Sequence, residues 1–419
     1  MYAKKKWLKI PIIVSGIVAS GIFCGALISN RTALHQAPKN DKISKLKLPE
    51  GFVAEHLFSP SDAQDGSWVS MTFDDKGRMI TSDQYGFLYR LVIPEIGSSE
   101  KPKVEKLKIG TDANLDKVSM GYAQGLLYAF NSLYVVVNNR ENDKFAKGSG
   151  LYRLQDTDGD DQYDKITLLK TMKGEGEHGP HSIILSPDKK SLYIVAGNHT
   201  DLPQMDTYRL TPNWADDNLF PVIKDPRGHA NDRHAPGGWI VNTDPEGKKW
   251  ELISAGYRNP YDIAFNEAGD LFIYDADMEW DFGQPWYRPT RVSQAVSGGE
   301  DGWRTGSGKW HPSFEDNIPP IQNIGQGSPT NLIYLKDARF PEKYKNTLLA
   351  FDWSFGIVHA MRITPKGASY SSQHSEFLSG SPLPLTDGAI GPDGALYFLT
   401  GGRRLESDLY RVYYKDYKN

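Results

Sequence analysis

The sequence has a single cysteine among its 419 residues, Cys24. One cysteine excludes an intramolecular disulfide, a CxxCH haem attachment and a zinc or iron–sulfur site built on cysteines. The chain also lacks an excess of charge of one sign, because 48 Lys and Arg face 52 Asp and Glu for a net charge of −4. Without a basic excess there is no electrostatic footprint for nucleic acid, so we expect no nucleic-acid partner.

Helical patterns are scarce as well. Beyond the N-terminus, little of the chain repeats apolar residues at the 3.6-residue spacing of an amphipathic helix. Instead it has 40 Gly, 26 Pro and 12% aromatic residues. This composition is typical of short strands joined by many turns, and it predicts an all-β protein.

The N-terminus is the exception to this pattern. A lysine-rich flank precedes 19 residues without a charge, Ile10 to Ile28. That length is closer to the roughly 20 residues of a spanning helix than to the about 7–15 of a signal-peptide core. We therefore expect residues 1–30 to form a transmembrane anchor and residues 31–48 a tether, with the lysines inside. The rest of the chain would be exported to the periplasm or cell exterior, and it would be secreted if the segment were cleaved.

One phrase recurs after Gly51: an apolar run, a polar turn and a second apolar run, which is the pattern of a β-hairpin. One such sheet cannot bury both its faces, whereas six sheets packed around an axis can. The repeats predict a six-bladed β-propeller over residues 49–416, closed by pairing near its two ends. Two stacked sandwiches would leave the repeats unexplained. The six copies are residues 68–83, 124–139, 181–198, 261–277, 344–363 and 387–402.

Polar residues gather at corresponding points of these repeats. In a propeller the loops that enter the inner strands converge at one end of the central channel, so side chains just before each repeat should face a common pocket. Residues just after the first strand pair should reach the same end. The two groups are Gln124, Glu177, His178, His181, Arg258, Asn259 and Asp387, and then Asn198, His199, Arg403 and Arg404.

A separate acidic turn lies between two expected strands, residues 150–154 and 165–169. Its sequence, DTDGDDQYD, places acidic side chains at alternate positions, and Gly159 permits a tight backbone. Such a turn can wrap hard oxygen ligands around calcium, although it differs from an EF-hand in its glycine position and lacks flanking helices. A solvated acidic hairpin is the alternative. The expected calcium ligands are Asp156, Asp158, Asp160 and Asp164.

Several motifs, taken in order, carry a family resemblance: AQGLL, EH before a strand, GYRNP before an AF…GDLF hairpin, and a final GPDGALYFLTGGR. Together they resemble the soluble quinoprotein glucose dehydrogenases, also described as glucose/sorbosone or aldose sugar dehydrogenases, over about residues 48–414. Residues 237–281 resemble most closely the exported membrane-bound dehydrogenase branch common in planctomycete-type bacteria. The resemblance implies a six-bladed propeller with pyrroloquinoline quinone (PQQ) on its pseudo-axis, which oxidises a sugar's anomeric hydroxyl to a lactone.

The resemblance also implies roles for individual residues. His178 matches the general base, which takes the hydroxyl proton while hydride passes to the quinone. One departure concerns the cations that meet the cofactor's carboxylates, because the fifth-blade region has Asp352 and no lysine. The implied catalytic residues are His178, Arg258 and Gln124, and the implied cofactor-binding residues are Glu177, Asn259, Arg403 and Arg404.

We therefore expect an exported, membrane-tethered, PQQ-dependent sugar dehydrogenase. It would oxidise a sugar or alcohol and pass electrons to a separate acceptor, because it has no haem of its own. Two alternatives stay open: a calcium-dependent propeller hydrolase of the lactonase type, and a non-catalytic glycan-binding propeller. The balance of cations against carboxylates at the channel mouth separates the first two, since a trianionic cofactor needs cations and a metal ion needs carboxylates. The hydrolase would bind its ion through Glu177, Asn198, Asn259 and Asp387.

Overall fold

The protein is described by a computed structural model over residues 41–110, 120–139, 147–214, 228, 230–276, 287–305, 308–315 and 317–416. The predicted anchor and the first part of the predicted tether lie outside these ranges. Within them, no helix is both long and apolar enough to cross a membrane. The chain divides into residues 1–39 and a compact unit, Asn40–Asn419.

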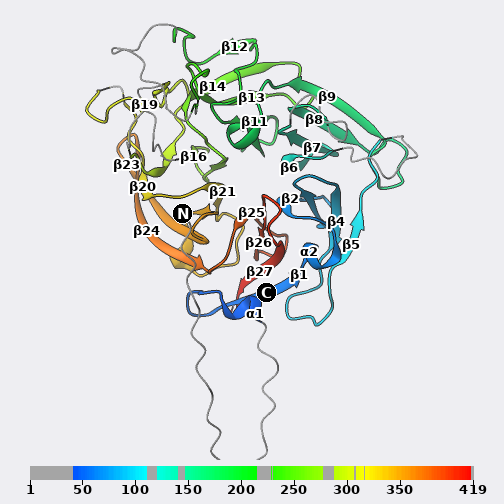
Figure 1. The fold of residues 1–419 in the computed structure, drawn as a ribbon. Helices are drawn as coiled ribbons and strands as arrows, with labels where there is room; N and C mark the ends of the chain where they lie inside the picture. The colour runs from blue at the N-terminus through cyan, green and yellow to red at the C-terminus, as the bar shows by residue number, and fades with distance from the viewer. Residues whose placement is uncertain are drawn as a thin grey trace, which may run out of the picture. The chain divides into compact units, whose positions relative to one another are not determined.

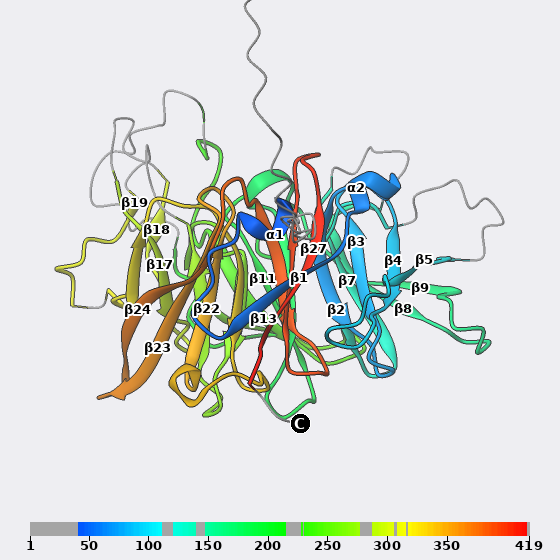
Figure 2. The same cartoon turned by 90° about the horizontal axis from the view of Figure 1, so that it is seen from below.

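The compact unit is a ring of six β-sheets around a central axis, as Figure 1 shows along that axis and Figure 2 from the side. Within each sheet, neighbouring main strands are antiparallel, and the first strand lies nearest the axis. The predicted six-bladed all-β propeller is therefore confirmed.

The first three blades follow one another along the chain. Blade three carries an added short strand, β12 (Thr207–Tyr208), which pairs in parallel with β14. Blade one is β2 (Trp68–Phe73), β3 (Met79–Asp83), β4 (Leu88–Val92) and β5 (Lys103–Lys106); blade two is β6 (Ala123–Ala129), β7 (Ser132–Val137), β8 (Gly150–Gln155) and β9 (Lys165–Thr171); blade three is β10 (Pro180–Leu185), β11 (Leu192–Ala196), β13 (Gly238–Thr243) and β14 (Trp250–Tyr257).

The last three blades complete the ring. A small hairpin, β18 (Trp303–Arg304) with β19 (Gly308–Lys309), lies in the connection between the third and fourth strands of blade four. Blade four is β15 (Asp262–Phe265), β16 (Leu271–Asp275), β17 (Thr290–Gln294) and β20 (Gln322–Gly325); blade five is β21 (Pro329–Tyr334), β22 (Thr347–Asp352), β23 (Ile357–Lys366) and β24 (Ser369–Ser379); blade six is β25 (Leu385–Ile390), β26 (Leu396–Thr400), β27 (Asp408–Tyr414) and β1 (Phe52–Phe58).

The hydrophobic core lies between the blades. Each of six large clusters of buried residues joins two neighbouring sheets, and the cluster of Phe272 and Leu348 joins blades four and five in this way. Successive apolar side chains of a strand point to opposite faces of the blade, and each face packs against a neighbouring blade. Burial on both faces explains why the strands read as continuous apolar runs.

The ring closes through β1, which comes from the start of the compact unit and pairs with β27 from its end, in the register Phe52 to Tyr414. The predicted closure by pairing of the two ends is thus confirmed. Phe52 packs edge-on against four aromatic rings, at centroid distances of 4.8–5.3 Å. These rings, from blades five and six, are Phe340, Tyr344, Phe377 and Tyr414.

The prediction for the fifth sequence repeat is wrong by one strand. Its predicted inner hairpin, residues 344–363, spans β22 and β23, which are the second and third strands of blade five. The inner strand is β21, and residues 335–346 join it to β22 through a short 3₁₀ turn, η2 (Glu342–Tyr344), rather than through a tight glycine turn. The absence of that turn hid the first strand of the repeat.

The chain packs onto the propeller earlier than residue 49. Residues 41–44 form the short helix α1 (Asp41–Ser44), and Lys47 bridges to the backbone of Ser379. Three apolar side chains of this stretch pack against the cluster between blades five and six, and Lys42 pairs with Asp408 at 2.6 Å. The last eight residues of the predicted tether therefore lie against the fold. A second short helix, α2 (Pro60–Ala63), follows β1.

Candidate functional site

The inner strands bend as they enter the channel. In five of the six blades the register with the second strand shifts near the start of the inner strand, at a β-bulge or similar irregularity. Bulges re-aim side chains and are common beside binding sites. All six inner strands line one cavity of about 370 Å³ on the axis of the ring, and Gln124 and Tyr261 reach it from blades two and four.

His178 ends a short 3₁₀ turn, η1 (Gly176–His178), just before β10, and it is only 3% exposed. Its Nδ1 lies 2.6 Å from Oδ1 of Asn198, and its ring lies 4.6 Å from that of His199. A carboxamide oxygen only accepts hydrogen bonds, so Nδ1 carries a proton, and in the neutral imidazole Nε2 would be the basic nitrogen. This tautomer is the one that a general base needs at Nε2.

A network of polar side chains connects this histidine turn to the channel. Nε2 of His181 lies 2.9 Å from Oδ1 of Asn259, whose Nδ2 donates to the carbonyl of Glu177 at 3.1 Å. The His181 ring stacks on Tyr261, and the Tyr261 hydroxyl donates to Gln124 at 2.6 Å. Burial lowers the pKa of His181 to about 4, so it is neutral near pH 7. His181 therefore holds the loops in place as an uncharged support.

The loop that carries Arg258 and Asn259 is anchored by a buried carboxylate. Asp275, at the end of β16, accepts the backbone N–H of Arg258 at 3.2 Å and that of Asn259 at 2.8 Å. Lys309 pairs with Asp275 at 2.5 Å and also with Asp301. Burial alone would raise the pKa of Asp275, but the Lys309 charge and the hydrogen bonds hold it below its usual value. Through Lys309, the hairpin β18–β19 thus helps to hold this loop in place.

Positive charge is in excess around this anchor. Arg288 and Arg291 are both buried, and their charges act on the carboxylate of Asp301 together with that of Lys309. Among the described residues, three buried cations therefore share two buried carboxylates, Asp275 and Asp301. Nε and Nη2 of Arg291 are buried without a hydrogen-bond partner in the same part of the chain. A guanidinium left in this state is costly, and an anionic ligand would relieve the cost.

The two arginines predicted on blade six lie apart. Arg403 reaches Glu177, with Nη2 and Oε2 3.2 Å apart, and its guanidinium lies over the ring of Trp353. Arg404 instead lies over the ring of Tyr85, 5.0 Å from its centre. Backbone and side-chain contacts therefore connect one group of residues around one mouth: Glu177, His178, Arg258, Asn259 and Arg403, with Gln124 joined through Tyr261. The Arg404 guanidinium lies against Tyr85, outside this group.

The acidic turn between β8 and β9 lies on a different part of the molecule. Ligand oxygens of Asp156, Asp158 and Asp164 lie within 4.8 Å of one another. Asp160 is outside this group; its carboxylate accepts the backbone N–H of Gln162 at 2.9 Å, and the grouped aspartates also accept backbone N–H groups of the turn. Three of the four predicted calcium ligands are thus grouped and the fourth caps the turn.

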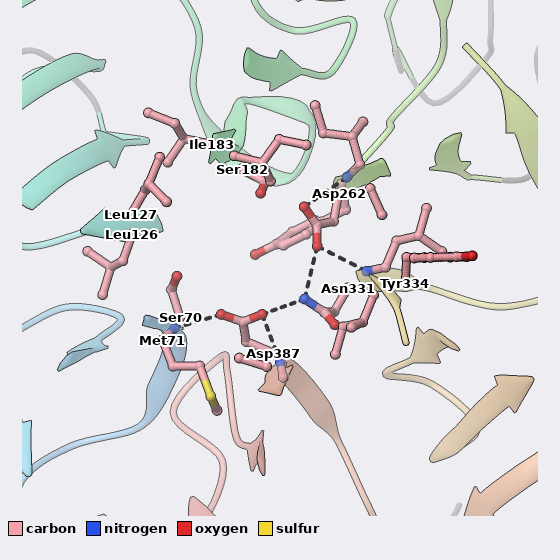
Figure 3. Close-up of a pocket in the computed structure, with 18 of the residues that line it drawn as sticks. Ser70, Met71, Leu126, Leu127, Ser182, Ile183, Asp262, Asn331, Tyr334 and Asp387 are labelled. Carbon is pink, nitrogen blue, oxygen red and sulfur yellow. Dashed lines mark hydrogen bonds between the residues drawn. The ribbon is translucent and has the colours of Figure 1, made fainter. Parts of the chain in front are cut away.

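A third polar group lies inside the channel, where Figure 3 shows it. Asn331 donates through Nδ2 to Asp262 at 2.9 Å and to Asp387 at 2.6 Å. Burial raises the pKa of Asp262 to about 6, and burial together with the Asp262 charge raises that of Asp387 well above its usual value. Asp387 was expected at the channel mouth and lines the channel cavity instead.

The sequence prediction includes Asp387 but not Asp262, Asn331 or Asp275. Alignment of the repeats would have placed Asp262 and Asp387 at the same point of two inner strands, and Asn331 joins them once β21 is recognised as the inner strand of blade five. Asp275 is the last residue of an apolar strand, and a carboxylate at that position is a further sequence signal of a site. Nothing in the sequence places Lys309 against a residue 34 positions earlier.

Solved structures share the fold at low sequence identity. A glucose dehydrogenase of Thermus thermophilus is 17% identical with a TM-score of 0.61, and 86% of this chain and 100% of that chain are covered. The PQQ-bound form of an aldose sugar dehydrogenase from Streptomyces coelicolor is 15% identical with a TM-score of 0.55, covering 87% and 100%. A calcium structure of a Trichoderma reesei carbohydrate-active enzyme of family AA12 is 11% identical with a TM-score of 0.60, covering 88% and 97%.

These likenesses establish the propeller fold. No curated protein sequence matches the chain. A family described as a domain of unknown function, DUF7133, matches residues 38–400, which is most of the chain and nearly all of the propeller. The chain belongs to this family, DUF7133.

Proposed function

We propose that this protein is an exported, membrane-tethered oxidoreductase that binds PQQ and oxidises a sugar hydroxyl, with His178 as the general base. The observation that carries the proposal is the pairing of a buried histidine base with a neighbouring excess of buried cations. Solved structures of the same fold that are described as sugar dehydrogenases support the choice of reaction.

The base is prepared by its surroundings. Asn198 fixes the His178 tautomer through the 2.6 Å contact, so that Nε2 can accept the proton of a substrate hydroxyl. Asn198 is itself buried, and its Nδ2 has no hydrogen-bond partner among the residues that the structure describes. An orphaned donor beside a base offers a place for an oxygen atom of a ligand.

The cations suit an anionic cofactor. PQQ would supply the two-electron acceptor for the hydride of the substrate. Buried nitrogens of Arg291, whose charge acts on Asp275 behind the mouth, lack partners within the described ranges, and Arg258 and Arg403 lie on the rim of the mouth. Each charge-assisted hydrogen bond to a carboxylate of the ligand would contribute about 1.5–3 kcal/mol. These arginines would compensate for the missing lysine of blade five.

Two further parts of the proposal concern metal and location. The grouped oxygens of Asp156, Asp158 and Asp164 would hold a structural calcium ion, whose hard-oxygen preference they match. The apolar segment of residues 10–28 would anchor the protein, and electrons would leave to a separate acceptor.

The hydrolase alternative is less well supported at the mouth. It needs carboxylates and amides free to surround an ion, yet Glu177 pairs with Arg403 and Asn259 is bonded to His181. By the balance of charge, the mouth suits an anion better than a cation.

The test is turnover. The full chain would be mixed with PQQ, calcium and a panel of aldoses, and reduction of an artificial dye would be followed. We expect activity that depends on PQQ and that falls at least about 100-fold in His178→Ala with cofactor binding retained. Arg362→Ala, an exposed change on β23, is the matched control. Absence of PQQ-dependent turnover on any aldose, or full activity in His178→Ala, would contradict the proposal.

A further inference from the structure

The axial cavity combines oxygen ligands with an absence of positive charge. Its described lining includes Asp262, Asp387, Asn331, Ser70 and Ser182, but no lysine, arginine or histidine. Asp262 and Asn331 are 6% and 5% exposed. The carboxylates of Asp262 and Asp387 face the same space without a cation, so they repel each other and lose part of their hydration. Asn331 and backbone N–H groups donate hydrogen bonds to both carboxylates, but none of the lining residues that the structure describes brings a positive charge.

The spacing of the two carboxylates permits them to share one ion. One oxygen of Asp262 lies 2.9 Å from Nδ2 of Asn331, and one oxygen of Asp387 lies 2.6 Å from the same nitrogen. The two oxygens are therefore separated by at most the sum of these distances, about 5.5 Å. Calcium–oxygen bonds are about 2.3–2.6 Å, so two oxygens that bind one ion are separated by at most about 5.2 Å. A single ion can bridge the pair.

The side chain of Asn331 is an independent indication that the cavity binds a cation. Its Oδ1 is buried and has no hydrogen-bond partner in the described part of the chain. The amide lies between the two carboxylates, as Figure 3 shows, and rotation by about 180° around its last bond would exchange Nδ2 for Oδ1. Oδ1 would then become a third oxygen ligand, and the orphaned acceptor would be satisfied. The hydroxyls of Ser70 and Ser182 line the same space as further oxygen donors.

We infer that the channel binds one divalent cation of the calcium type through Asp262, Asp387 and Asn331. A divalent ion neutralises both carboxylates, whereas a monovalent ion leaves one negative charge. The three residues come from β15, β21 and β25, the inner strands of blades four, five and six. The ion therefore ties together three consecutive blades at the axis, among them blade six, through which the ring closes.

This site is separate from the acidic turn of blade two, and its test must separate the two. The full chain carrying Asp156→Asn, Asp158→Asn and Asp164→Asn would serve as the background, because these changes remove the grouped oxygens of the turn. After treatment with a chelator, calcium chloride would be titrated by calorimetry without quinone or sugar. Failure of this inference is thereby distinguishable from failure of the proposed function.

In this background we expect one calcium ion per chain and a melting temperature that rises with calcium. Asp262→Asn and Asp387→Asn should each weaken binding at least about tenfold. Asp337→Asn is the matched control, since Asp337 lines the same cavity but is exposed and outside the carboxylate pair; it should bind within about twofold of the background. No binding at about 1 mM calcium, or binding unchanged by both asparagine variants, would overturn the inference.

A second variant covers the case in which these substitutions disturb folding. Asn331→Asp places three carboxylates together, so the ion-free protein should melt at a lower temperature than the background. Added calcium should restore the melting temperature. If calcium restores nothing, Asn331 acts only as a hydrogen-bond donor and the inference is wrong.

Discussion

Replacing Lys309 by methionine would remove the cation that holds the two buried carboxylates behind the candidate site. Asp275 and Asp301 are 1% and 6% exposed, and both contact the Lys309 ammonium. Methionine keeps most of the side-chain volume but no charge, so both carboxylates would have to stay buried with less compensation. Breaking a buried ion pair on one side typically costs about 3–5 kcal/mol.

The size of this cost sets the expected change in melting temperature. The compact unit has 380 residues, Asn40–Asn419. At about 2.1 cal/mol/K per residue its unfolding entropy is about 0.8 kcal/mol/K, so the loss corresponds to a fall of roughly 4–6 °C. Differential scanning calorimetry of wild type and Lys309→Met at pH 7.5 would measure it.

The pH dependence gives the sharper test. Without Lys309, burial raises the folded-state pKa values of Asp275 and Asp301 above those of the unfolded chain. A carboxyl whose pKa is raised on folding keeps its stability below the unfolded value, near pH 4, and loses it as pH rises through the folded value. The deficit of the variant should therefore be small near pH 4 and grow toward pH 8. Lys309→Arg, which keeps the charge, should recover most of the stability. A deficit under about 1 kcal/mol, or one independent of pH, would refute the reasoning.

Two further predictions concern stability. The pKa of His181 is about 4 in the fold and about 6.5 when unfolded, so acid favours the unfolded chain, and stability should fall by roughly 3 kcal/mol from pH 6.5 to pH 4. Chemical denaturation across that range should show a smaller fall in His181→Gln, and equal slopes would contradict the assignment. Phe52→Ala empties a site among four aromatic rings and should cost about 3–5 kcal/mol by the same calorimetry. Phe355→Ala, at an exposed position, should stay within about 0.5 kcal/mol; equal losses would contradict the stabilising role assigned to the Phe52 ring.

The blades were predictable because each one repeats a local pattern of apolar strands and turns. The exception is blade five. Blade five joins its first two strands through residues 335–346 rather than through a tight turn, so the repeat was placed one strand late. That shift concealed Asn331, the residue that connects the two channel carboxylates.

The candidate site was predictable only where it depends on the repeats. Glu177, His178, Arg258 and Asn259 gather at one mouth because they precede inner strands of neighbouring blades. Lys309 could not be placed, because it lies on a hairpin inside a long connection and its partner Asp275 belongs to another strand.

Local backbone conformation also redirects side chains in ways that a motif does not encode. Arg403 and Arg404 both have positive φ angles, 50° and 65°, in the turn after β26. Consecutive residues in this conformation point in different directions, so one reaches Glu177 and the other Tyr85. The bulges of the inner strands act in the same way on the channel residues.

The central claim is that the mouth binds an anionic quinone through its excess of buried cations, and an absorbance titration of the full chain with PQQ tests it most directly. We predict saturable, stoichiometric binding that Arg291→Met and Arg258→Ala each weaken by at least about tenfold, while Arg362→Ala leaves it unchanged. No saturation at about 50 µM PQQ, or equal affinity in all four proteins, would contradict the account.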